Sequence, residues 1–150
     1  MRVLQLLPEL KLGGVERGTV DLSEHLTKLG HHSAVVSAGG RLTEQLSSHG
    51  AKHFSLPIAK KNFLAIRQYK NLRDIYQEFR PDIIHVRSRF PAWINVLALK
   101  NMPSSKPIVI STFHGLYSKP FYSKSMSYAD DIIAISKTVQ EYVFKNYDVD

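Results

Sequence analysis

Short apolar runs alternate with amphipathic stretches along the whole chain, and this alternation restricts the fold more than any other feature of the sequence. The apolar runs have the length of strands, and the amphipathic stretches repeat apolar residues every three or four positions, as one face of a helix does. Strands joined by helices form a parallel sheet with right-handed crossovers. The sequence therefore predicts an α/β fold, a Rossmann-like doubly wound parallel sheet with helices on both faces.

Glycines, prolines and one serine set the boundaries of the predicted elements. Gly30 ends the first helix, Pro91 begins another, and Ser136 fits the N-cap of the last. Residues 113–129 are predicted to be a loop with a short helix. The expected strands cover residues 3–7, 32–38, 52–56, 82–86, 108–112 and 131–135, and the expected helices cover residues 15–29, 42–48, 63–79, 92–99 and 137–145.

The last three predicted strands are rich in Ile and Val and show no polar alternation, which is typical of central strands buried on both faces. His85 lies inside one of them and is interpreted as a packed, hydrogen-bonded histidine. The longest predicted helix, residues 63–79, carries an apolar stripe that we expect to be buried against the sheet.

Length and composition exclude several classes of protein. The 150 residues fit one ordinary domain. No apolar stretch approaches the ~20 residues that a membrane span needs, and no secretory signal begins the chain. The sequence has no cysteine, which excludes disulfide frameworks, thiolate zinc sites and thiol nucleophiles and is compatible with a reducing compartment.

Positive charge is concentrated in one segment. The formal net charge is +7, and residues 60–80 hold six basic and two acidic side chains. Such a surface favours a polyanionic partner, such as an anionic membrane or a phosphorylated glycan; the alternative is a solvated helix face. The chain lacks the aromatic and basic pattern of a nucleic-acid-binding module, so no nucleic-acid partner is expected. The candidate surface consists of Lys60, Lys61, Arg67, Lys70 and Arg73.

Ligands of open parallel sheets bind at the carboxyl ends of the strands, which selects four loops. The first contains Gly13, Gly14 and Glu16, between a strand and a helix. The glycines let the backbone approach a ligand, and the helix N-terminus offers unpaired N–H groups suited to phosphate. The alternative is a tight turn without a ligand, because the segment matches neither a GxGxxG nor a Walker motif.

The other three loops carry basic or hydroxyl side chains. Arg87 and Arg89 could hold a phosphate or carboxylate in bidentate hydrogen bonds, or instead face an acidic residue and solvent. His114 could donate a hydrogen bond or act as an acid or base, or be a structural or exposed histidine. Ser136 is most simply a helix cap, with a ligand contact as the alternative. The sequence has no catalytic triad and no paired-histidine spacing, so no metal is expected.

Four segments in this order resemble a known family: GGVER, DIIHVRSR, IVISTFHG and ADDIIAISKTVQEYV. The chain resembles the N-terminal half of a retaining glycosyltransferase of family 4 with the two-domain GT-B architecture, nearest to bacterial enzymes that build lipopolysaccharide core or surface glycans. The resemblance implies that Gly13 and Gly14 lie beside the donor diphosphate or the acceptor, and that His114 is the cleft histidine near the transferred sugar. It implies a nucleotide-sugar donor as substrate, no cofactor and no metal.

The resemblance also implies a second, donor-binding domain that this sequence does not contain. Residues 1–150 are then the acceptor-binding domain, which we expect to fold alone and to transfer no sugar. The whole protein is expected to be a hexosyltransferase acting on a lipopolysaccharide-core, glycolipid or polysaccharide acceptor, cytoplasmic and peripheral on the inner face of the membrane. The alternative is a non-catalytic phosphate- or nucleotide-binding α/β module. An NAD-dependent oxidoreductase is disfavoured because GxGxxG is missing.

Overall fold

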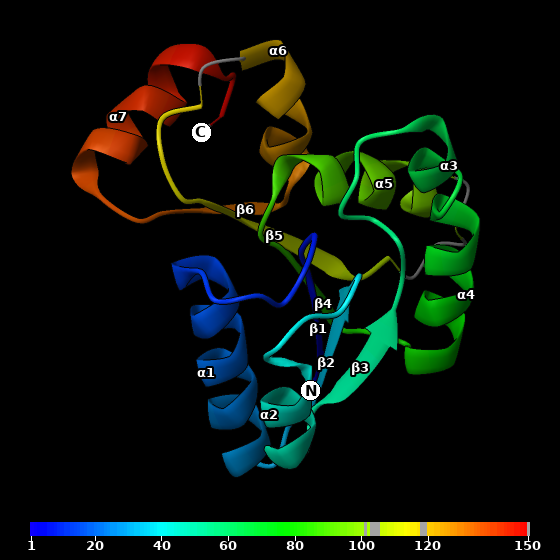
Figure 1. The fold of residues 1–150 in the computed structure, drawn as a ribbon. Coiled ribbons are helices and arrows are strands. Elements are labelled where there is room, and N and C mark those ends of the chain that lie inside the picture. Colours follow the sequence, from blue (N-terminus) through cyan, green and yellow to red (C-terminus); the bar gives the residue numbers. More distant parts are fainter. Residues whose placement is uncertain (101, 103–105, 118–119, 150) are drawn as a thin grey trace.

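The computed structural model describes residues 1–100, 102, 106–117 and 120–149, and Figure 1 shows their arrangement. In this part of the chain six parallel strands form one sheet in the order β3-β2-β1-β4-β5-β6. From β1 the chain adds β2 and β3 on one side, and it then crosses back to add β4, β5 and β6 on the other side of β1, as in a doubly wound sheet. The strands are β1 (Arg2–Leu6), β2 (His32–Ser37), β3 (Lys52–Ser55), β4 (Ile83–Val86), β5 (Ile108–Phe113) and β6 (Asp131–Ala134).

Helices cover both faces of this sheet. Two of them, α1 (Gly14–Lys28) and α2 (Thr43–Ser48), pack together on one face. The opposite face carries α4 (Tyr69–Phe79), which follows β3, and α5 (Arg89–Leu99), which follows β4, and Figure 1 shows these two side by side. The other helices are α3 (Phe63–Ile66), α6 (Pro120–Ser123), the 3₁₀ helix η1 (Lys124–Tyr128) and α7 (Lys137–Asn146).

Alternating side chains on the strands pack into two separate hydrophobic clusters, one on each face of the sheet. On β1, Leu4 and Leu6 belong to the larger cluster under α4 and α5, whereas Gln5 bonds to α1 on the other face. Val35 on β2 and Val20 on α1 belong to the smaller cluster. Each fully buried side chain of this kind contributes ~1.5–3 kcal/mol, so both faces of the sheet need a cover. The predicted Rossmann-like doubly wound fold is confirmed.

The long helix predicted over residues 63–79 is two helices, which corrects the sequence prediction. Asn62 caps the first of them, because its Oδ1 accepts a hydrogen bond from Ala65 N–H at 2.8 Å. The helices are separated by Arg67 and Gln68, and Gln68 N–H donates to Ala65 O in a tighter three-residue turn.

Only the second part of the predicted apolar stripe is buried. On α4, Leu72 and Tyr76 lie in the larger cluster. On α3, however, the side chains of Phe63 and Leu64 are 71% and 70% exposed, and Ile66 is 38% exposed. The break between the helices therefore leaves an apolar tip on the surface.

Helix α5 begins earlier than predicted. Ser88 is its N-cap residue, Arg89 is its first residue, and Pro91 lies in the first turn. Because the first N–H groups of a helix have no partner inside it, a proline is tolerated at this position. The helix start expected at Pro91 is thus corrected to Arg89.

The segment from residue 113 to residue 129 contains more regular structure than predicted. Phe113 is the last residue of β5, and the expected short helix is present as α6 followed by η1. Residues 118 and 119 of the predicted loop lie outside the described residues.

Strand β6 is not buried on both faces, contrary to the prediction. It lies at the end of the described sheet and pairs with β5 alone among the described strands. Ile133 and the following Ile135 are 47% and 55% exposed. An apolar run without polar alternation therefore does not distinguish an edge strand from a central one when the covering element is not visible in the local sequence.

Candidate functional site

The loop between β1 and α1 is held in place by the turn after β2. Leu10 N–H donates to Gly39 O at 2.8 Å, and Leu10 O accepts from Leu42 N–H at 2.9 Å. Gly40 has a φ of +147°, and a Cβ on it would clash with the Leu10 backbone. Glycine at position 40 is therefore needed for this close approach, which fixes the loop at the carboxyl end of β1.

Two adjacent glycines at the start of α1 have different surroundings. Gly13 is the N-cap residue, and its carbonyl oxygen accepts from Arg17 N–H at 2.9 Å. The Glu16 carboxylate folds back over Gly13, so an added Cβ there would clash with Glu16 Oε2. A Cβ on Gly14, in contrast, would meet nothing within 4 Å. The fold therefore does not require glycine at position 14, and the space beside it lies open at the positive end of α1.

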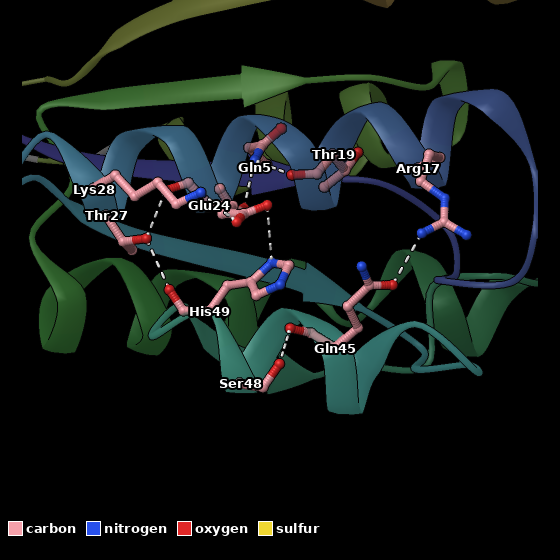
Figure 2. A network of polar contacts seen from close by, with 10 residues as sticks. Gln5, Arg17, Thr19, Glu24, Thr27, Lys28, Gln45, Ser48 and His49 are labelled. Atoms are coloured by element: carbon pink, nitrogen blue, oxygen red, sulfur yellow. Dashed lines mark hydrogen bonds and ion pairs between the residues drawn. The ribbon is translucent and has the colours of Figure 1, made fainter.

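Arg87 is a buried arginine just after β4, 9% exposed. Its Nη1 donates to Gln5 Oε1 at 2.9 Å. Gln5 Nε2 donates in turn to Thr19 O at 3.0 Å and to Ser23 Oγ at 2.8 Å; Figure 2 shows its contact with Thr19. Gly18 leaves room for the guanidinium, because a Cβ there would lie 3.3 Å from Arg87 Nη2. Together these groups hold Arg87 beside the first turns of α1.

This guanidinium lacks a counter-ion in the described part of the chain. Its Nε is buried and has no hydrogen-bond partner there, and the ion pairs of the described residues lie elsewhere. Burial lowers the pKa of Arg87. A buried charge without a partner costs several kcal/mol. The unpaired positive charge of Arg87 therefore favours binding of an anion at this site.

Two histidines lie close to this charge. His85 Nε2 is 2.7 Å from Thr112 Oγ1, and burial, then the charge of Arg87, lowers the pKa of His85 to about 4. His85 is therefore the packed, hydrogen-bonded histidine that the sequence predicts. His114 follows β5, and its backbone N–H donates to Tyr117 OH at 3.3 Å.

The His114 side chain is a half-buried, neutral imidazole. Its Nε2 is buried and has no hydrogen-bond partner among the described residues. Burial, and to a lesser extent Arg87, lowers the pKa of His114. A neutral imidazole provides one donor and one acceptor, which suits recognition of a sugar hydroxyl.

The sheet brings together some predicted site residues and separates others. Arg87, His114 and the Gly13–Gly14 loop lie at one edge. Arg89 takes another direction, and its Cζ lies 4.6 Å from the ring centroid of Tyr117. The two arginines therefore do not form one joint clamp.

Ser136 serves as a helix cap. Its Oγ accepts a hydrogen bond from Val139 N–H at 3.2 Å. A hollow of about 790 Å³ between β6 and α7 is bordered by Ser136 and Lys137, and neither His114 nor Arg87 lines it. The simpler interpretation of Ser136 is confirmed, and the hollow is separate from the Arg87 edge.

Arg17, beside the predicted loop, connects two helices instead. Its Nη1 donates to Gln45 Oε1 at 3.0 Å. Figure 2 shows this contact in a row of polar contacts between α1 and α2 that also includes Thr27 Oγ1 donating to His49 O at 2.8 Å. These contacts orient α1, and with it the helix N-terminus at the site.

The basic segment contains one arginine that is already engaged. Arg73 Nε donates to Ala98 O at 3.1 Å and its Nη2 donates to Lys100 O at 3.0 Å, so it caps the carboxyl end of α5. Lys60 and Lys70 are exposed. The other two cations stack on aromatic rings, with Lys61 Nζ at 4.7 Å from the Tyr122 centroid and Arg67 Cζ at 6.0 Å from that of Phe63.

Sequence reasoning missed Gln5 and Gly18. The sequence does contain a signal for Gln5, because it is the one polar residue in an apolar run predicted to be covered on both faces. A polar side chain in such a place needs a buried hydrogen-bond partner. Gly18 gives no local signal, since its role depends on Arg87, which is distant in sequence and adjacent in the fold.

Neither a metal centre nor a membrane span is found in the described part of the chain. Within the described ranges, no three His, Asp or Glu side chains gather as a metal site would need. Among the same residues, no helix is both long enough and apolar enough to cross a bilayer.

Comparison with known proteins identifies the family. The sequence profile of glycosyltransferase family 4 matches residues 12–150. The chain belongs to glycosyltransferase family 4. No curated protein sequence matches it.

Several solved structures share the fold of this family 4 chain. A glycosyltransferase from Rickettsia africae superposes with a TM-score of 0.81 and 34% identity, over 99% of this chain and 40% of that one. The lipopolysaccharide outer core galactosyltransferase WaaB gives 0.76 and 16%, over 99% and 43%. Sucrose-phosphate synthase from Thermosynechococcus elongatus gives 0.74 and 14%, over 97% and 45%. The family 4 chain thus has the fold of one domain of these proteins and spans less than half their length.

Proposed function

We propose that this family 4 chain is the acceptor-side N-terminal domain of a retaining GT-B glycosyltransferase. The whole protein moves a hexosyl group from a nucleotide sugar to a lipopolysaccharide-core, glycolipid or polysaccharide acceptor. The observation that carries the proposal is the buried Arg87 guanidinium without a counter-ion among the described residues, beside the open N-terminus of α1 and the neutral His114. The names of the Rickettsia africae glycosyltransferase and of WaaB support the same reaction class.

The residues divide the work of transfer as follows. The N-terminus of α1, at Gly13 and Gly14, and the Arg87 guanidinium stabilise the negative charge that develops on the departing diphosphate. His114 contacts a hydroxyl of the transferred sugar. Glu16, at the same helix start, orders the Gly13 side of the loop. In front-face transfer assisted by the donor phosphate the protein supplies position and charge stabilisation, so no protein nucleophile is required.

The proposal is tested by comparing residues 1–150 with the protein that also carries the donor-binding domain. We expect the 150-residue chain to unfold cooperatively and to transfer no sugar, and the two-domain protein to release nucleoside diphosphate from a nucleotide sugar only when an acceptor glycan is present. Transfer by the 150-residue chain alone contradicts the domain assignment. Nucleotide binding by the two-domain protein without transfer to any glycan acceptor favours the non-catalytic binding module.

We also propose that the protein lies on the inner, cytoplasmic face of an anionic membrane, and that α3 makes the contact. The exposed Phe63 and Leu64 form an apolar tip, and exposed cations precede and follow it in the sequence. Apolar side chains that enter the acyl boundary and cations that face anionic headgroups are the two signals of peripheral membrane binding. This α3 surface consists of Lys60, Lys61, Phe63, Leu64, Arg67 and Lys70.

Vesicle sedimentation at low salt tests the α3 surface. Each basic residue near an anionic surface contributes about 1 kcal/mol, so Lys60→Gln with Lys70→Gln is expected to weaken binding to phosphatidylglycerol vesicles about 30-fold. Phe63→Ser with Leu64→Ser is expected to weaken it at least as much. Leu29→Ser is the matched control, because Leu29 is 59% exposed at the C-terminal end of α1. Equal binding by all variants identifies the segment as a solvated face.

A further inference from the structure

A group of two cations and two aromatic rings lies next to the candidate site. Arg89 Cζ is 4.6 Å from the ring centroid of Tyr117 and 5.3 Å from that of Tyr122. Lys61 Nζ is 4.7 Å from the same Tyr122 centroid, so both cations contact one ring. The Arg89 cluster is defined as Lys61, Arg89, Tyr117 and Tyr122. Its members come from three separate segments: the loop before α3, the start of α5 and the region after β5.

The positive charge of the Arg89 cluster is not neutralised within the described part of the chain. The carboxylates that form ion pairs there are Glu9, Glu24 and Glu78, and their partners are other residues. Arg89 is half-buried and Lys61 is exposed, so the charges are accessible from solvent. Two like charges on one ring repel each other, and an anion between them would remove that cost.

The two tyrosines add aromatic ring faces to this charge. Burial raises the pKa of both Tyr117 and Tyr122, with Arg89 opposing the shift, so both phenols are protonated near pH 7. The Tyr122 hydroxyl has no hydrogen-bond partner among the described residues. Tyrosine rings also offer an apolar surface for the C–H face of a sugar.

The Arg89 cluster is continuous with the edge that carries His114. Tyr117 forms the connection, because its hydroxyl accepts the hydrogen bond from His114 N–H and its ring carries Arg89. Lys61, at the other end, belongs to the α3 surface. The cluster thus occupies the space between the residue assigned to the transferred sugar and the surface assigned to the membrane.

We propose that the Arg89 cluster is a binding subsite for a saccharide that carries an anionic group, a phosphate or a carboxylate, and that this saccharide is the acceptor. The Arg89 fork binds the anion in a bidentate manner, Lys61 adds a point charge, and a tyrosine ring packs against the sugar. The role as acceptor rests on the proposed function, whereas binding of an anionic sugar does not. A neutral sugar can use only the stacking surface of the tyrosine rings in this cluster, and it is expected to bind more weakly.

Nuclear magnetic resonance titration of the 150-residue chain tests the subsite with three probes: glucose 6-phosphate, glucuronate and glucose. We expect both charged sugars to shift the Arg89 Nε–H and Gly115 amide signals, and glucose to leave them in place. Stronger binding of the phosphate than of the carboxylate identifies a phosphorylated sugar as the preferred source of the anion, and the reverse identifies a uronic acid. Equal shifts with glucose overturn the proposal, because the anion is then not recognised.

Charge-matched variants separate a specific site from general attraction. Arg89→Gln is expected to weaken binding of the preferred charged sugar at least 10-fold, and Arg89→Lys to restore part of it. Arg41→Gln removes one exposed cation elsewhere and is expected to bind as the wild type does. Equal losses in Arg41→Gln and Arg89→Gln overturn the subsite. If Arg89→Gln does not fold, the exposed Lys61→Gln repeats the test with the same criterion.

Activity of the two-domain protein distinguishes failure of this proposal from failure of the proposed function. If transfer occurs, a preference for anionic over neutral acceptors that Arg89→Gln abolishes supports the acceptor role. Transfer to neutral acceptors at full rate, unchanged in Arg89→Gln, overturns that role and leaves the glycosyltransferase proposal intact.

Discussion

Replacing His114 by alanine in the two-domain protein is expected to lower turnover about 10²–10³-fold, or roughly 2.7–4 kcal/mol of transition-state stabilisation, with little change in Tm. The imidazole is half-buried and neutral, and its Nε2 has no partner among the described residues. Removing it therefore breaks no described side-chain hydrogen bond, while its contact with the sugar is lost. Turnover and thermal unfolding are measured on the same preparations.

Gly14→Ala provides a companion test of the same edge. The added Cβ meets no protein atom within 4 Å, so stability is expected to stay within about 0.5 kcal/mol. The added methyl group enters the space assigned to the reacting groups. Turnover is expected to fall roughly 10²-fold because the reacting groups are then misplaced. Gly40→Ala is the control for a structural glycine, and its clash with Leu10 and positive φ are expected to cost about 3 kcal/mol.

Two outcomes contradict the assignment of this edge. Near-normal turnover in His114→Ala removes the histidine from the sugar contact. Loss of activity in His114→Ala and Gly14→Ala that merely follows loss of folding makes both residues structural, and the active-site assignment then moves to Arg87, Arg89 and the donor-binding domain.

Replacing Arg87 by methionine is expected to stabilise the 150-residue chain and to inactivate the two-domain protein. A buried guanidinium without a counter-ion destabilises the fold, so its removal is expected to raise the free energy of unfolding by about 1–2 kcal/mol, or about 4 °C in Tm, even though Gln5 loses a donor. Turnover is expected to fall at least 10²-fold because the departing diphosphate loses a cation.

The histidine pKa supplies an independent measure of the same charge. Arg87 contributes to the lowered pKa of His85 and His114, so Arg87→Met is expected to raise both pKa values, measured by proton resonance of the rings. The shift is partial, since burial is the larger cause. Arg17→Met, which removes an arginine bonded to Gln45, is the control and is expected to change neither pKa nor turnover. A lower Tm with normal turnover in Arg87→Met identifies Arg87 as a structural residue.

The sequence by itself determined the strands, the parallel sheet and the family. The spacing of apolar residues and the positions of glycine and proline depend on only a few neighbouring residues. They therefore predict local structure correctly wherever local and tertiary preferences agree. The loops at the carboxyl ends of β1, β4 and β5 follow from the same pattern, which is why the sequence alone singles out Gly14, Arg87 and His114. Their shared edge is a consequence of the strand order.

Contacts between distant segments decided the rest. Arg87 and Arg89 look equivalent in sequence, yet Gln5 and α1 bury the first, and Tyr117 and Tyr122 receive the second. The capping role of Arg73, the exposed tip of α3 and the open side of β6 depend in the same way on elements far along the chain. Tertiary packing decides which face of the fold surrounds a side chain and whether a charged side chain finds a partner there. Local periodicity carries no information about that partner.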